Sequence, residues 1–178
     1  MERGTARRLW LLRHAKSSWD DPAVPDEDRP LAPRGELAAA AMAAHLAAAG
    51  VRPDLVLCSA ALRARQTLGA VFASLGGALE IRVEPELYTF DAGVLLARLR
   101  QIDDAVRSVM LVGHNPAMQD LGLRLTGSGA DRARLETKLP TGALVAIVVP
   151  DPGWSVLADG ACALEGLVTP RDILPPDP

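Results

Sequence analysis

Short, uninterrupted apolar segments alternate with helix-forming segments along most of this chain, and this alternation limits the folds open to it. The apolar runs lie at about 9–12, 54–58 and 108–112. A run without polar alternation is typical of a strand that is covered on both faces. Strands that alternate with helices in this way indicate a largely parallel sheet with helices on both sides.

The same patterns predict where the elements begin and end. We expect strands at about 7–13, 54–58, 80–83 and 108–112, and helices at about 33–49, 59–75, 91–101 and 116–125. Segments 143–149 and 155–158 are predicted to form a closing hairpin through Asp151-Pro152-Gly153. The predicted fold class is α/β, a three-layer α/β/α sandwich whose mostly parallel central sheet has an antiparallel edge strand.

Length and composition bound the remaining possibilities. A chain of 178 residues suits one domain, here residues 1–178, with a proline-rich surface tail at about 169–178. The net charge of −3 implies no basic surface for nucleic acid. We expect no membrane span and no secretory signal, because the apolar runs are too short. Cys58 and Cys162 are far apart and match no metal-ligand spacing. They suggest no disulfide scaffold, so a protein of the reducing cytoplasm is expected.

Cationic and imidazole side chains follow three of the predicted strands at the points where those strands end. Arg13 and His14 follow the first strand, with Lys16 close behind. Arg63 lies just after the second strand, and His114 follows the fourth. Because the carboxyl ends of parallel strands share one edge of a sheet, the two histidines could meet there with Arg63 between them.

This combination of side chains suits phosphoryl chemistry. A neutral imidazole can attack phosphorus, and the phosphorylated ring can then be hydrolysed. Guanidinium groups neutralise phosphoryl oxygens through paired hydrogen bonds that lysine cannot match. Taken alone, the cluster at 13–16 could equally be a solvated strand end. The residues after the other two strands favour a phosphate site.

Five short motifs carry the remaining chemical signal. They are Leu12-Arg13-His14-Ala15-Lys16-Ser17-Ser18-Trp19, Asp28-Arg29-Pro30-Leu31 with Pro33-Arg34-Gly35, Ser59 through Arg63-Ala64-Arg65-Gln66-Thr67, Val112-Gly113-His114-Asn115-Pro116, and Leu139-Pro140-Thr141-Gly142-Ala143. In this order, over roughly residues 8–150, they make the chain resemble the histidine phosphatase superfamily, with its phosphoglycerate-mutase-like fold. Within that superfamily the chain is similar to the SixA-type phosphohistidine phosphatase branch.

The resemblance implies a role for each matching residue. His14 would be the phosphorylated nucleophile, in a phosphate pocket completed by Arg13, Arg63 and His114. It also implies that no metal or organic cofactor is needed. Ala15 stands where the commonest superfamily version has glycine, and alanine there is familiar in the SixA-type branch. Asp20 replaces an asparagine that many members place near the phosphate, so we expect it to turn away or to pair with an arginine.

The general acid is less certain from the sequence than the nucleophile. Many members of the superfamily use a glutamate that lies between the second and fourth strands, and the candidates here are Glu84, Glu86 and Asp91. Glu86 is the best placed, although it could equally be a solvated loop residue. SixA-type members lack a clear acid, which suits a phosphoramidate substrate whose imidazole leaves easily.

Two further residues of the first motif have open roles. Lys16 could contact the phosphate or could be a solvated loop residue. Trp19 is expected to pack against the protein rather than to stack on a substrate.

The predicted function is that of a metal-independent phosphatase that acts on protein phosphohistidine through an intermediate on His14. The short chain leaves little length for the lid that covers the pocket in larger relatives, which favours a protein substrate. The alternative is a phosphatase for a small phosphate ester or anhydride, with Glu86 as acid. A third possibility is a non-catalytic phosphate-binding module. The expected partner is therefore a phosphorylated protein or a small phosphorylated compound.

Overall fold

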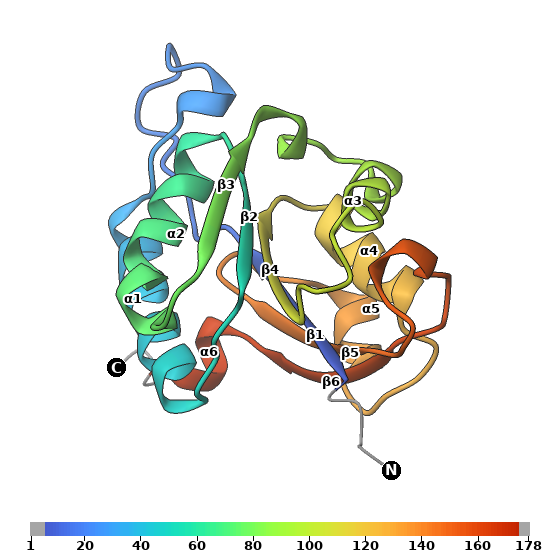
Figure 1. Ribbon diagram of the computed structural model, residues 1–178. Coiled ribbons are helices and arrows are strands. Elements are labelled where there is room, and N and C mark those ends of the chain that lie inside the picture. Colours follow the sequence, from blue (N-terminus) through green and yellow to red (C-terminus); the bar gives the residue numbers. More distant parts are fainter. Residues whose placement is uncertain (1–5, 175–178) are drawn as a thin grey trace.

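The computed structural model describes residues 6–174 (Figure 1). Its strands are β1 (Arg7–Arg13), β2 (Leu55–Ser59), β3 (Glu80–Glu84), β4 (Ser108–Gly113), β5 (Leu144–Val149) and β6 (Ala163–Val168). Its α-helices are α1 (Pro33–Ala48), α2 (Leu62–Leu75), α3 (Ala92–Leu99), α4 (Ala117–Leu125), α5 (Arg132–Thr137) and α6 (Pro170–Ile173). Three short 3₁₀ helices are η1 (Asp26–Asp28), η2 (Pro85–Leu87) and η3 (Trp154–Val156).

The six strands form one sheet in the order β3-β2-β4-β1-β5-β6. The pairs β3–β2, β2–β4 and β4–β1 are parallel, whereas β1–β5 and β5–β6 are antiparallel. The α/β sandwich with an antiparallel edge is therefore confirmed. The carboxyl ends of β1, β2 and β4 lie at one edge, where open α/β sheets bind their ligands.

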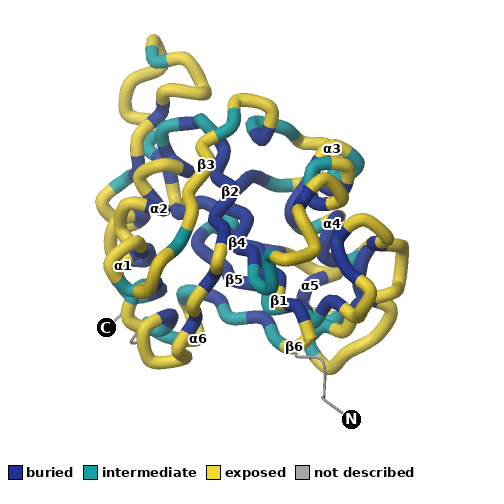
Figure 2. The backbone as a smooth tube through the Cα atoms, in the orientation of Figure 1, coloured by how far each residue is buried: buried dark blue, intermediate teal, exposed yellow. Residues whose placement is uncertain are grey.

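The strands divide the core into two layers because their apolar side chains point alternately to opposite faces. In β1, Leu9 and Leu11 belong to the cluster that α3, α4 and α5 cover. Trp10 and Leu12 belong to the cluster that α1 and α2 cover. Figure 2 shows the central strands buried and the edge strand β3 exposed. Continuous apolar runs thus mark the strands that are buried on both faces, as predicted.

The closing hairpin differs from the prediction in its second strand. Strand β5 matches the predicted segment, but its partner β6 begins at Ala163, and residues 154–156 form η3 instead. The reason is Trp154, which is fully buried and whose indole N–H donates to the Val106 carbonyl at 2.8 Å. Its backbone N–H donates to Asp104. These contacts hold the segment against the core, so the return strand starts later.

Two further segments contain helices that the sequence patterns did not indicate. The polar segment 126–141 contains α5, which buries Leu135. The proline-rich tail begins with α6, where Thr169 and Asp172 form a capping box. Residues 1–5 and 175–178 lie outside the described residues, so the assignment of 1–178 to one domain stays a prediction. In residues 6–174, no helix is both long enough and apolar enough to cross a membrane.

Candidate active site

His14 lies just beyond the carboxyl end of β1, where the backbone is held from three sides. Its N–H donates to the Gly113 carbonyl at 3.0 Å, and its carbonyl accepts from Gly142 N–H at 3.0 Å. The next residue, Ala15, donates its N–H to Thr67 Oγ1 at 2.9 Å. Strand β4, the loop before β5 and helix α2 thus all fix the position of His14.

The turn after His14 also depends on close contact with helix α1. The Lys16 carbonyl accepts from Ala32 N–H at 2.8 Å, just before α1 begins. A Cβ atom added to Gly35 would lie 2.0 Å from that Lys16 oxygen. Only glycine fits at this position, which explains the Pro33-Arg34-Gly35 motif: it lets the first turn of α1 approach the loop that follows His14.

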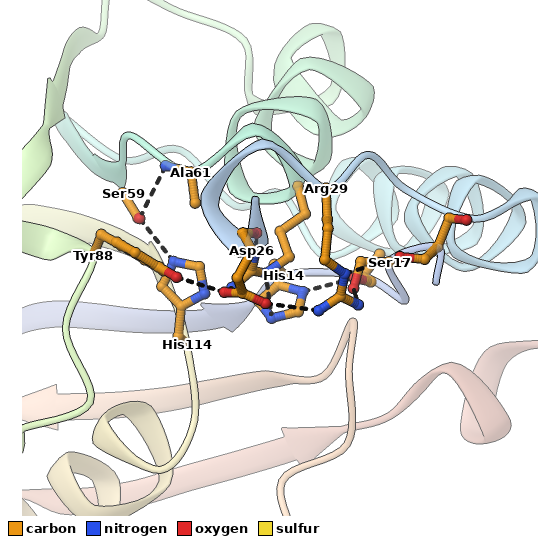
Figure 3. Close-up of polar contacts among 11 residues, drawn as sticks. His14, Ser17, Asp26, Arg29, Ser59, Ala61, Tyr88 and His114 are labelled. Atoms are coloured by element: carbon orange, nitrogen blue, oxygen red, sulfur yellow. Dashed lines mark hydrogen bonds and ion pairs between the residues drawn. The ribbon is translucent and has the colours of Figure 1, made fainter. Parts of the chain in front are cut away.

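The two buried imidazoles meet at this edge of the sheet, as predicted from the sequence (Figure 3). The ring centroids of His14 and His114 are 5.0 Å apart. His114 Nε2 lies 2.7 Å from the Oγ of Ser59, the last residue of β2. Among residues 6–174, His114 Nδ1 and Arg13 Nε are buried and have no hydrogen-bond partner. Buried polar atoms normally have a partner, so both atoms have unused hydrogen-bonding capacity.

The tautomer of His14 is set by its neighbours. Nδ1 lies 2.7 Å from the Ala15 carbonyl, which can only accept, so this nitrogen carries the proton. Nε2 therefore keeps its lone pair and accepts from Arg63 Nε at 3.4 Å. Such a ring can use Nε2 as a nucleophile.

Burial and positive charge keep both imidazoles neutral. Burial, together with the charges of Arg63, Arg13 and Arg29 and against the opposing effect of the Ala15 hydrogen bond, lowers the pKa of His14 to about 4. Burial lowers the pKa of His114 to about 3, and the nearby His14 and Arg63 act in the same direction. A neutral imidazole is the form that can attack phosphorus.

Asp26 is the carboxylate that faces this cluster, and it was missed in the sequence. One of its oxygens accepts from Arg63 Nη2 at 2.9 Å, and the other accepts from Arg29 Nη1 at 2.7 Å. The Tyr88 hydroxyl also donates to it, as Figure 3 shows. The hydrogen bonds from Tyr88, Arg29 and Arg63 lower the pKa of Asp26 to about 2, so it is ionised.

A cavity of about 280 Å³ brings these groups together. Its lining includes most of the residues predicted for the site, together with others from the loops around it: Arg13, His14, Lys16, Ser17, Trp19, Asp26, Arg29, Arg63, Phe90, His114, Asn115 and Thr141. Four of these side chains are cationic and one is a carboxylate. The cavity can therefore hold an anion of phosphate size beside His14 Nε2.

The three candidate acids from the sequence lie in different settings. Glu84 is paired with Arg98 through two hydrogen bonds of 2.8 Å, and Asp91 caps α3 at Gly93. Glu86 is exposed in η2 and does not line the cavity. The structure thus does not bring Glu86 into this cavity. Lys16 is exposed but does line the cavity, so its contact with phosphate stays a prediction.

Asp20 and Trp19, which follow His14 in the same loop, are both exposed. Asp20 is exposed and is not part of the cavity lining. Trp19 packs one part of its indole against the Arg29 guanidinium but is 69% exposed, so its packing is only partial. Within residues 6–174, no group of three or more His, Cys, Asp or Glu side chains could hold a metal ion. That the chemistry needs no metal stays a prediction.

Paired imidazoles and arginines at the carboxyl edge of an α/β sheet are the arrangement expected of a protein that carries out phosphoryl chemistry with histidine. Comparison with known proteins gives the family. Residues 9–107 match the model of the histidine phosphatase superfamily (branch 1), and the chain belongs to this superfamily.

Its relatives in sequence include an uncharacterized protein of Mycobacterium tuberculosis. The two are 37% identical over 164 residues, which cover 90% of this chain and all of the relative. An uncharacterized chloroplastic protein of Arabidopsis thaliana is 35% identical, over 93% of this chain and 78% of the relative.

Solved structures extend the comparison. A candidate phosphohistidine phosphatase SixA from Nakamurella multipartitia has a TM-score of 0.79 and 30% identity, covering 93% of this chain and 96% of its own. The protein histidine phosphatase SixA complexed with tungstate has a TM-score of 0.76 and 25% identity. The match covers 94% of this chain and 99% of that structure's chain. A candidate α-ribazole-5′-P phosphatase from Escherichia coli shares the fold, with a TM-score of 0.67 and 21% identity. That match covers 93% of this chain and 98% of the other.

Proposed function

We propose that this protein is a metal-independent phosphatase that removes phosphate from histidine residues of a protein, through a phosphohistidine intermediate on His14. The observation that carries the proposal is the hydrogen bond between His14 Nδ1 and the Ala15 carbonyl. It leaves Nε2 of a buried, neutral ring unprotonated beside the Arg63 guanidinium. A nucleophile and a cation that stabilises the phosphoryl group are thus adjacent.

In the first step, the lone pair of His14 Nε2 forms a bond to phosphorus. The P–N bond to the substrate's imidazole breaks, and its electron pair returns to the leaving nitrogen. When the other nitrogen of that ring is protonated, the ring departs neutral and needs no separate acid. This fits a cavity in which Glu86 is not a lining residue.

In the second step, a water oxygen attacks the phosphorus and the bond to His14 Nε2 breaks. One water proton stays on the product phosphate, the other passes to solvent, and His14 returns to its neutral form. Arg63, Arg13 and Arg29 would balance the charge on the phosphoryl oxygens in both steps. His114 Nδ1, which has no partner among residues 6–174, would donate to one of those oxygens in the neutral tautomer that carries its proton on Nδ1.

The solved relatives support the substrate class. Two structures with TM-scores of 0.79 are described as candidate phosphohistidine phosphatases, at 30% and 32% identity. The SixA structure with tungstate indicates that a tetrahedral oxyanion binds that protein. Neighbours described as small-molecule phosphatases share only 19–21% identity. They supply the competing hypothesis, a small phosphate ester or anhydride as substrate.

A substrate panel separates the two hypotheses. The full-length protein would be assayed on phosphohistidine peptides, sugar phosphates and nucleotides, with the Glu86→Gln variant assayed in parallel. We expect phosphohistidine to give the highest kcat/KM and Glu86→Gln to leave it unchanged. Faster ester turnover that is lost in Glu86→Gln would favour the small-molecule hypothesis. Phosphate binding without turnover of any substrate would favour a binding module.

A further inference from the structure

Aromatic side chains are scarce in this chain, yet half of them lie around the phosphate cavity. The sequence has three tryptophans, one tyrosine and two phenylalanines. Trp19 and Phe90 line the cavity, and Tyr88 contacts the His114 ring edge-on at 5.2 Å. Trp19 is 69% exposed and Phe90 is 53% exposed. Single exposed aromatics are ordinary, but two on the rim of one cavity indicate contact with a bound molecule.

Trp19 is held in place without being buried. The guanidinium carbon of Arg29 lies 3.2 Å from the centroid of the indole. Arg29 is itself buried, and it donates to Ser17 Oγ, the Ser18 carbonyl and Asp26. The stacked cation fixes the indole, while most of the ring remains exposed to solvent.

Phe90 is fixed from the opposite loop. It contacts Tyr88 edge-on, with ring centroids 5.8 Å apart, and lies 6.3 Å from the His114 ring. Tyr88 is in turn tied to Asp26. The loop after β1 and the loop after β3 rise from the same end of the sheet (Figure 1). The two exposed rings therefore reach the cavity from separate loops.

We infer that Trp19 and Phe90 form an aromatic clamp for the flat ring of the leaving group, the imidazole of a phosphohistidine residue. This inference rests on the proposed function and specifies how its substrate is selected. With the phosphoryl group beside His14, the group attached to phosphorus must leave through the rim that these rings border. A planar imidazole can stack on them, whereas the leaving group of an aliphatic phosphate cannot. Such ring contacts are worth roughly threefold to tenfold in affinity each.

The test compares two substrates that share the P–N bond. A phosphohistidine peptide has the ring, and phosphoramidate has only an amino group on phosphorus. We would measure kcat and KM for both with wild type, Trp19→Ala and Phe90→Ala. Phe72→Ala is the matched control, because Phe72 is 51% exposed on α2 and lies outside the cavity lining. Trp19→Phe and Phe90→Tyr are the conservative variants.

Each alanine variant at the rim should raise KM for the phosphohistidine peptide by roughly threefold to tenfold and leave phosphoramidate turnover unchanged. The conservative variants should recover most of the loss, and Phe72→Ala should behave as wild type. Equal losses on both substrates, or no loss on either, would overturn the clamp.

If the proposed function is wrong, the set of substrates that the wild-type enzyme hydrolyses will show it. In that case wild type would hydrolyse neither P–N substrate, and the same variants would be assayed on phenyl phosphate and glycerol phosphate. A KM increase confined to the phenyl compound would keep the clamp as a site for aromatic leaving groups. Equal effects on both esters would reject it.

Discussion

The sheet carries a cavity near each end, and the two contain similar side chains in different states. The cavity near the amino ends of β1 and β4 has a volume of about 550 Å³ and includes Arg8, His45 and Arg52 in its lining. The phosphate cavity at the carboxyl ends is half that size, about 280 Å³. Volume alone therefore does not single out the cavity where we propose catalysis.

The difference lies in burial and in hydrogen-bond partners. At the amino end, Arg8 is half exposed and paired with Glu165, and Arg52 is exposed and donates to the Val51 and Ser74 carbonyls. At the carboxyl end, Arg63 is only 4% exposed and faces His14 Nε2. Arg63 is buried and faces both an imidazole nitrogen and the Asp26 carboxylate, an arrangement that suits action on a substrate, whereas the solvated arginines at the amino end stabilise a surface.

Replacing one histidine in each cavity by alanine should give the largest difference in turnover between the two ends of the sheet. His14→Ala should eliminate turnover, because it removes the imidazole nitrogen that accepts from Arg63 Nε. His45→Ala, in the larger cavity, should keep wild-type kcat. Steady-state assays on a phosphohistidine peptide measure both. Activity in His14→Ala, or its loss in His45→Ala, would break the distinction between the two ends.

Replacing an arginine should likewise lower kcat at the carboxyl end of the sheet and not at the amino end. Arg63→Ala should lower kcat by roughly 10²–10³-fold, the usual effect of losing one preorganised transition-state donor. Arg63→Lys should not restore the rate, because lysine lacks the planar fork. Arg52→Ala should leave kcat unchanged. Circular dichroism would establish that each variant is folded, and equal rates for Arg63→Ala and Arg52→Ala would contradict the contrast.

Gly35 and Gly50 should tolerate an added methyl group to different extents. Gly35→Ala places a methyl group against the Lys16 carbonyl, and overpacking of this kind costs about 1–3 kcal/mol or more. Gly50, which lines the larger cavity, has φ +64° and open space around its Cβ direction. Gly50→Ala should cost only about 1–2 kcal/mol for the left-handed backbone.

Urea denaturation gives both stabilities, and activity supplies the sharper test. Only Gly35→Ala should lower kcat, because its contact lies two residues beyond His14. An active Gly35→Ala enzyme of wild-type stability would show that this close approach does not matter.

The stability of the protein should also depend on pH, through the two buried imidazoles. Burial lowers the pKa of His14 to about 4 and of His114 to about 3, below the ordinary value of 6.5. Between pH 6.5 and 4 the unfolded chain binds protons that the folded chain does not, so the free energy of unfolding falls as the pH falls. The limit is about 1.4 kcal/mol per pH unit for each ring.

His14→Gln should flatten this slope between pH 7 and pH 5 in urea denaturation experiments. The acidic limb of wild-type kcat/KM should also lie below pH 5 rather than near 6.5. A limb near 6.5 would mean that His14 titrates as a solvent-exposed histidine.

The sheet and the meeting of the two histidines could be predicted because local patterns set them. Continuous apolar runs define β1, β2 and β4, and parallel pairing puts their carboxyl ends at one edge. The residues directly after each of these strands are then brought together whatever path the loops take. This is why His14, Arg63 and His114 could be assigned to one site from the sequence.

The loop residues could not be predicted, because their positions depend on tertiary contacts. Asp26 lies in a segment with several acidic residues, 20–28, and nothing local distinguishes it from Asp20. Its role comes from η1, which turns it toward Arg63 and Tyr88. Glu86 was favoured by its place between the strands, yet η2 leaves it exposed. The late start of β6 likewise depends on the burial of Trp154.

The most direct test is to locate the phosphoryl group on the trapped enzyme. A ³²P-labelled phosphohistidine protein would be mixed with the enzyme and quenched in alkali, and the labelled residue and ring nitrogen identified by mass spectrometry and ³¹P NMR. We expect the label on His14 at Nε2, because Nδ1 is hydrogen-bonded to the Ala15 carbonyl. Label on Nδ1 or on His114, or turnover by an enzyme that never becomes labelled, would contradict it.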